Sequence, residues 1–153
     1  MDSLIRVIAP HPFFAGLSDE VLELVAGCAS NVRFEPGTFL FRKGDAADGF
    51  FLVRHGRVDL EIDAPGRGPL VIETIEEDEV FGYGWLFPPY QRSYDAHART
   101  LVRAVHMDGE CLRRKCDEDP AFGYDMVRRF ARVMMNQLES TRLRLLDVYG
   151  KGH

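Results

Sequence analysis

The sequence contains no hydrophobic run that approaches the length of a membrane-spanning segment. The apolar residues near the amino terminus are too few for a signal peptide, and Arg6 interrupts them. These two absences predict a cytoplasmic protein that makes no contact with a membrane.

An excess of positive charge is also missing. The 19 Lys and Arg residues are outnumbered by 24 Asp and Glu residues, which gives a formal net charge of -5. Domains that bind nucleic acid usually concentrate basic charge on one face. The charge balance therefore argues against direct nucleic-acid binding, although it is compatible with a local basic patch.

Cysteine and histidine are few, and they form no recognisable ligand pattern. Cys28, Cys111 and Cys116 include no CxxC pair, and the five histidines form no HxH or HExxH motif. Because structural zinc usually requires four well-spaced ligands, we expect no metal site. The favoured interpretation is that the cysteines are reduced, buried thiols. No Ser-His-Asp or Cys-His arrangement is recognisable, so the sequence does not indicate an enzyme.

A chain of 153 residues can bury a core without metals or disulfides, and one domain over residues 1–153 is the expectation. The pattern divides it into a helical segment at 1–30, a β-rich segment at 31–107 and a helical segment at 108–149. In the first segment, Ser18 is a good N-cap for a helix whose apolar residues Val21, Leu24 and Val25 share one face.

Short runs of β-branched and aromatic residues alternate with glycine and aspartate between residues 31 and 107. The clearest alternation lies at 57–62, and Gly37, Gly44 and Gly56 stand at the ends of runs, where glycine tolerates a positive φ. Closely spaced strands with turn residues between them predict a compact antiparallel barrel or sandwich.

The carboxyl-terminal segment predicts two helices. Asp108 can cap a short helix that runs to Cys116, and Asp119-Pro120 can begin a longer helix that ends near Tyr149. One stripe of the longer helix has apolar residues at nearly heptad spacing, and it includes Val127, Phe130, Met134, Leu138 and Leu145. The favoured explanation is a homodimer through these five residues, and packing against the chain's own β-rich segment is the alternative.

Residues 80–98 combine several features of a small-molecule site. A glycine-rich turn is followed by room for one helical turn and then by the pair Arg92-Ser93. Backbone N–H groups of a short helix can bind an anion, and an arginine adds charge-assisted hydrogen bonds. We therefore predict an anion-binding cassette at 81–98. Its candidate ligand-binding residues are Gly82, Tyr83, Gly84, Trp85, Arg92 and Ser93.

Five other segments resemble the cyclic nucleotide-binding domain of catabolite-activator and Fnr-like regulators, of kinase regulatory subunits and of gated channels. These segments are Phe13–Ser18, Phe34–Thr38, Phe41–Asp45, Asp48–Val53 and Gly56–Val58. The resemblance implies a mainly β fold, namely an eight-stranded antiparallel, jelly-roll-like β-roll with an amino-terminal helix and a long carboxyl-terminal helix. It also implies that residues 81–98 are the family's phosphate-binding cassette.

The cassette departs from the family pattern at two positions. Matching positions are Phe81, Gly82, Arg92, Ser93 and Ala98. Tyr83 replaces the family's glutamate, which binds the ribose hydroxyl, and Trp85 replaces a small residue beside the phosphate. One lost hydrogen bond to a ligand hydroxyl costs about 1–3 kcal/mol, and a tryptophan in the pocket would overlap the ligand. Ordinary cAMP binding is therefore disfavoured. The candidate ligands are cAMP, cGMP or another small anion, or else Tyr83 and Trp85 fill the pocket.

The resemblance implies a regulatory module. Our first hypothesis is a stand-alone sensor in which the ligand shifts the long helix, which then signals to a partner protein. The second is a ligand-free scaffold that docks a partner protein. A DNA-linked transcription regulator is least favoured, because such proteins have a helix-turn-helix after the long helix and this sequence ends at His153.

Overall fold

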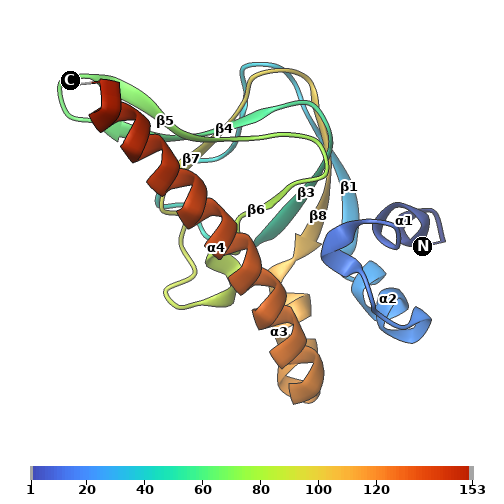
Figure 1. Cartoon of the computed structure of the whole chain (residues 1–153). Coiled ribbons are helices and arrows are strands. Elements are labelled where there is room, and N and C mark those ends of the chain that lie inside the picture. The colour runs from blue at the N-terminus through green and yellow to red at the C-terminus, as the bar shows by residue number, and fades with distance from the viewer. Residues whose placement is uncertain (1, 152–153) are drawn as a thin grey trace.

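The computed structural model describes residues 2–151 and shows a β-roll with helices before and after it (Figure 1). The amino-terminal helices are α1 (Asp2–Ile8), the short 3-10 helix η1 (Pro12–Phe14) and α2 (Asp19–Ala26). The strands are β1 (Ala29–Phe34), β2 (Phe39–Phe41), β3 (Gly49–His55), β4 (Val58–Ala64), β5 (Gly68–Ile75), β6 (Val80–Phe81), β7 (Asp95–Ala98) and β8 (Val102–Asp108). A second 3-10 helix, η2 (Tyr83–Leu86), lies between β6 and β7, and α3 (Gly109–Glu118) and α4 (Pro120–Lys151) follow the roll.

The strands form two four-stranded antiparallel sheets, in the orders β1-β8-β3-β6 and β2-β7-β4-β5. The predicted fold class is therefore confirmed. Strand β3 is buried on both faces, and successive strand residues point to opposite sides. Phe51 and Val53 join the core inside the roll, whereas Phe50 and Leu52 join a second core beneath the helices.

The predicted helix caps are present. The Ser18 hydroxyl accepts a hydrogen bond from the Val21 N–H at 3.2 Å, and the Asp108 carboxylate accepts one from the Cys111 N–H at 3.0 Å. Helix α4 begins at Pro120, as expected from the preceding Asp119. The helical segment predicted to reach residue 30 ends earlier, because Ala29 and Ser30 pair with β8 as the start of β1.

The prediction of three reduced cysteines was wrong. Cys28 and Cys111 form a disulfide with their Cα atoms 5.7 Å apart, and Cys116 is the free cysteine. The antiparallel pairing of β1 with β8 brings together the residue before β1 and the first turn of α3. The two cysteines are 83 residues apart in sequence, so local spacing gave no sign of their pairing.

The predicted dimer seam on α4 needs correction at Phe130. That ring is fully buried in the chain's own helix-side core and cannot face a partner. Val127, Leu138 and Leu145 are instead exposed by 43%, 51% and 51%. In Figure 1 the first half of α4 lies near α3 and the roll, whereas its second half runs alongside the β4–β5 hairpin, where Arg144 donates to the Ile72 carbonyl.

Candidate functional site

The cassette begins with a sharp turn at Gly82, which caps η2. Gly82 has a φ of 97°, in the left-handed region that favours glycine. A Cβ atom added there would lie 2.9 Å from Nη1 of Arg92. Both the turn and the close approach of the arginine therefore require glycine, and they bring Gly82 and Arg92 together as the sequence predicted.

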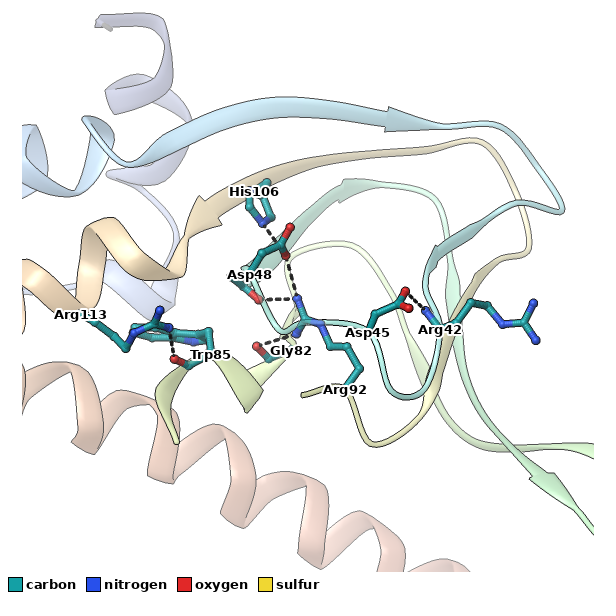
Figure 2. A network of polar contacts seen from close by, with 9 residues as sticks. Arg42, Asp45, Asp48, Gly82, Trp85, Arg92, His106 and Arg113 are labelled. Carbon is teal, nitrogen blue, oxygen red and sulfur yellow. Dashed lines mark hydrogen bonds and ion pairs between the residues drawn. The ribbon is translucent and has the colours of Figure 1, made fainter. Parts of the chain in front are cut away.

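Arg92 points into the protein and is anchored by three acceptors (Figure 2). Its Nη2 donates to the Gly49 carbonyl at 2.7 Å and to the Asp48 carboxylate at 3.3 Å. Its Nη1 donates to the Gly82 carbonyl at 3.3 Å. The arginine thus ties the start of the cassette to the start of β3.

The surroundings of the guanidinium are partly apolar and partly charged. The side chain of Arg92 is 3% exposed, and its Cζ lies 4.1 Å from the centroid of the Phe41 ring, a cation–π contact. Burial lowers the pKa of Arg92, and the nearby Asp48 carboxylate opposes that shift. Asp48 is itself 73% exposed and also contacts His106 at 3.4 Å. Solvent therefore reaches the acidic partner of a buried cation.

Trp85 lies on the other side of the cassette, away from the roll interior. Its ring is fully buried, with centroid distances of 5.7 Å to Phe50 and 5.4 Å to Phe130 of α4. The carbonyl of Trp85 accepts a hydrogen bond from Nη1 of Arg113 in α3 at 2.5 Å (Figure 2). The side chain thus contacts the helix-side core, and it does not fill a pocket beside Arg92.

The other three candidate ligand-binding residues, Tyr83, Gly84 and Ser93, differ in their burial and in what they contact. Tyr83 is half-buried and packs against the helix-side core, and Ser93 is exposed. Gly84 lies in η2, where an added Cβ would be 3.1 Å from both the Ala47 Cβ and the Gln91 carbonyl oxygen. A role for these residues in ligand binding stays a prediction.

Two neighbours of Arg92 in sequence bear on the charge of the site. Asp95 faces away from the guanidinium, because its carboxylate accepts from the Lys43 N–H at 2.7 Å and pairs with Arg42 at 3.3 Å. Tyr94 packs against the roll core, and its hydroxyl has a raised pKa, chiefly because of burial and secondarily because of Tyr83. A neutral phenol therefore lies near the buried cation.

Sequence reasoning missed three residues that shape this site: Asp48, Phe41 and Arg113. Asp48 and Phe41 stand inside segments that resemble the family, but nothing in their spacing indicated contact with Arg92. Arg113 is one of several basic residues on α3, and only the docked helix shows that it holds the cassette.

A cavity of about 740 Å³ lies apart from the cassette, and Arg92 is not in its lining. It lies between α4, β5 and the segment from His11 to Ala15, and side chains of both charges line it, including Arg128, Arg132, Glu73 and Asp78. Among the residues whose side chains the structure describes, 4–149, no group of three His, Cys, Asp or Glu is placed to hold a metal ion. No helix within the same residues has both the length and the hydropathy needed to cross a membrane.

The family model described as the cyclic nucleotide-binding domain matches residues 31–119, which include the roll, the cassette and α3. The chain belongs to the cyclic nucleotide-binding domain family. It is 25% identical over 143 residues to the CRP-like cAMP-activated global transcriptional regulator of Mycobacterium tuberculosis. That alignment covers 94% of this chain and 62% of the regulator, so the chain spans less than two thirds of this relative.

Solved structures agree with the family assignment. A cyclic nucleotide-binding protein from Geobacter metallireducens superposes with a TM-score of 0.80 at 27% identity, over 90% of this chain and 99% of that one. The regulatory domain of Toxoplasma gondii PKA, solved with cAMP, superposes with a TM-score of 0.66 over 74% of this chain and 44% of that one. Its identity of 18% shows a shared fold alone.

In this cyclic nucleotide-binding domain, the hydrogen-bonding groups of Arg92 are only partly satisfied by the protein. Nε of Arg92 is buried without a partner among the described residues. Two of the three contacts of the guanidinium are long, at 3.3 Å. The protein's own acceptors therefore leave the Arg92 guanidinium incompletely hydrogen-bonded.

Proposed function

We propose that this domain is a regulatory module that senses a small anionic ligand at Arg92 and signals through α4. Cyclic nucleotides such as cAMP and cGMP are the first candidates, since the family binds them and Arg92 retains unused donor capacity. The observation that supports the proposal most is the double attachment of the cassette. Gly82 contacts Arg92, and Trp85, three residues later, packs on Phe130 of α4.

The attachment gives a physical route from ligand to helix. A phosphate would form charge-assisted bonds with the guanidinium, which are stronger than bonds to a neutral carbonyl. The contact from Nη1 to the Gly82 carbonyl is long, at 3.3 Å, and is therefore a weak restraint on the cassette. Its release would let η2 move, and close packing would pass that movement from Trp85 to Phe130.

The position of Trp85 bears on which ligand the site accepts. Its ring contacts Phe50 and Phe130, so the overlap with ligand expected from the sequence does not arise in this arrangement. Loss of the sugar-binding carboxylate remains, because Tyr83 offers only a phenol. We therefore expect a cyclic nucleotide to bind more weakly than at an intact cassette, by about five- to 150-fold for one lost hydrogen bond.

The partner in signalling is inferred from the surface of α4. Besides Val127, Leu138 and Leu145, its outer half exposes Met135 and Leu146, by 68% and 67%. Contiguous apolar surface on a helix commonly marks an interface. We propose that a second copy of the chain packs against this face of α4. An unidentified partner protein would then bind the resulting dimer. We keep a cytoplasmic location as part of the proposal.

A ligand-free scaffold is the second candidate function. The engagement of Arg92 by Asp48, Gly49 and Gly82 favours it, since the buried cation is neutralised without any ligand. A DNA-linked regulator is the least favoured candidate. Its support is the similarity to the Mycobacterium tuberculosis regulator, of which this chain spans 62%.

Thermal unfolding with added ligand separates the first two candidates. A ligand that binds only the folded protein raises the Tm in proportion to the logarithm of its concentration. We expect cAMP or cGMP to raise the Tm of the wild-type domain, and Arg92→Gln to abolish the increase. Arg42→Gln, whose side chain is 60% exposed, is the matched control and should leave the increase intact. If no cyclic nucleotide shifts the Tm of the wild type, the scaffold is the better account.

A further inference from the structure

The Cys28–Cys111 disulfide lies at a junction that hydrogen bonds already hold together. Cys28 ends the connection from α2 to β1, and Cys111 stands in the first turn of α3. The Cys28 carbonyl accepts a hydrogen bond from the Asp108 N–H at 2.8 Å, and the Asp108 carboxylate caps α3 at the N–H of Cys111. The covalent bond therefore adds a second restraint between α3 and the amino-terminal part of the roll.

Helix α3 links the cassette to α4. Arg113 donates to the carbonyl of Trp85, and its guanidinium lies 4.3 Å from the centroid of the Tyr90 ring. At the other end of α3, a Cβ added to Gly123 of α4 would lie 3.1 Å from the Cys116 carbonyl and 3.2 Å from its Cβ. Helix α3 therefore contacts both η2 and the start of α4.

The two bonded cysteines differ in their access to solvent, and the third is poorly suited to take part. Cys28 is 6% exposed, whereas Cys111 is partly exposed and offers a route for a reductant. Burial raises the pKa of the Cys116 thiol, with a further contribution from Asp117. Because the thiolate is the attacking species in disulfide exchange, a raised pKa disfavours exchange by Cys116.

Helix α3 is attached to the rest of the domain by core packing as well as by this bond. Leu112, one residue after Cys111, is fully buried and belongs to the helix-side core, which also contains Trp85 and Phe130. Chains of this length usually bury enough apolar surface to fold without disulfides. Disulfides in cytosolic proteins, where they occur, are usually transient and redox-sensing.

We infer that Cys28–Cys111 is a thiol–disulfide switch that sets how firmly α3 holds the cassette against α4. A dithiol reductant supplies two electrons and two protons, and the S–S bond breaks. Cys28 and Cys111 become thiols, and the reductant becomes a cyclic disulfide. In the reduced form α3 is still docked by Leu112 and by the Asp108 cap, but it opens more often, and the cassette and the first turns of α4 open with it.

A count of free thiols is the first test. Alkylation of the denatured, unreduced protein with N-ethylmaleimide should modify one cysteine, and alkylation after treatment with dithiothreitol should modify three. Modification of three cysteines without reductant would overturn the proposal, because no bond would be present to switch.

Hydrogen exchange of the oxidised and reduced protein is the second test. We expect reduction to accelerate exchange about tenfold or more in α3, η2 and residues 120–130, and to leave the β4–β5 hairpin unchanged. The Cys28→Ser/Cys111→Ser double variant should match the reduced protein, and Cys116→Ser should match the wild type. Equal acceleration in the hairpin, or a double variant that fails to fold, would overturn the switch, because the bond would then stabilise the whole domain. No acceleration at all would also overturn it, because the bond would then have no effect on α3.

The effect of the switch on ligand response rests on the proposed function, whereas the switch itself takes from that proposal only the cytoplasmic location. If reduction changes exchange in α3 and η2 while no cyclic nucleotide raises the Tm of either form, the switch stands and the proposed function fails. If a cyclic nucleotide raises the Tm equally in both forms and exchange is unchanged by reduction, the proposed function stands and the switch fails.

Discussion

The ring of Trp85 meets the ring of Phe130 edge to face, with their centroids 5.4 Å apart. This contact joins the cassette to α4 at a point where both side chains are fully buried. It gives Trp85 a packing role at a position where the resemblance implies a small residue. The side chain turns toward the helices, so the position serves the packing of α4 on the cassette.

Truncation of Phe130 should loosen α4 more than any exposed change in the cassette. Phe130→Ala removes a buried ring that contacts Phe13, Phe50 and Trp85, and we expect a loss of about 3–5 kcal/mol in the free energy of unfolding. Urea unfolding measures the change. Phe87→Ala is the control, because that ring is 48% exposed. Comparable losses in the two variants would contradict the packing described for α4.

Removal of the Arg92 guanidinium should destabilise the domain even without ligand. Arg92→Met leaves the carbonyls of Gly49 and Gly82 without this donor, and each unsatisfied buried acceptor costs about 1–3 kcal/mol. Asp48→Asn should cost under about 1 kcal/mol, because the carboxylate is largely exposed to solvent. Urea midpoints of the two variants test the order, and a larger effect of Asp48→Asn would show that the ion pair is the main restraint.

Glu73 should make stability depend on pH in the acidic range. Burial raises the pKa of this carboxyl above 4.5, Arg144 lowers it, and Glu79 raises it again. The folded state then binds the proton more tightly than the unfolded state, so stability from this group is present below pH 4.5 and declines as pH rises through the folded pKa.

Glu73→Gln should therefore stabilise the domain at pH 7 and lose that advantage on acidification below the unfolded pKa. Urea midpoints of the variant and the wild type at the two pH values measure the effect. Glu77→Gln, on the exposed turn between β5 and β6, is the control and should show a smaller difference. A stabilisation by Glu73→Gln that persists unchanged at low pH would contradict the raised pKa of the Glu73 carboxyl.

Charge on the outer half of α4 should break the proposed dimer. Leu138→Asp and Leu145→Asp place carboxylates on side chains that are 51% exposed, so the fold should tolerate them while a helix seam should not. Sedimentation equilibrium is expected to show monomers for both variants. Leu24→Asp, on α2 at 45% exposure, is the matched control and should remain dimeric. A dimer that survives both α4 changes refutes the seam.

Local sequence patterns predicted most of the fold. Alternating strands, glycine turns and the caps at Ser18, Asp108 and Asp119 are short-range signals, and the structure contains the expected elements at these places. The cassette turn at Gly82 and its closeness to Arg92 were also predictable, because the spacing matches a known pattern.

Long-range pairing was the part that sequence alone could not supply. The disulfide between Cys28 and Cys111 depends on the register of β1 against β8, and the orientation of Trp85 depends on the docking of α4. Phe130 fits a heptad seam by spacing, yet it is buried because the first half of α4 packs on the chain's own core. Periodicity identifies an apolar stripe, but it does not say what covers each residue.

The emission of Trp85 tests the central claim most directly, because it is the only tryptophan in the chain and it stands between the cassette and α4. Titration with cAMP or cGMP should change the intensity or wavelength of this emission in a saturable way, and Arg92→Gln should abolish the response while Arg42→Gln retains it. Binding detected by calorimetry without any change in Trp85 emission would contradict the proposed route from Arg92 to α4. The absence of binding by either nucleotide would contradict the sensor itself.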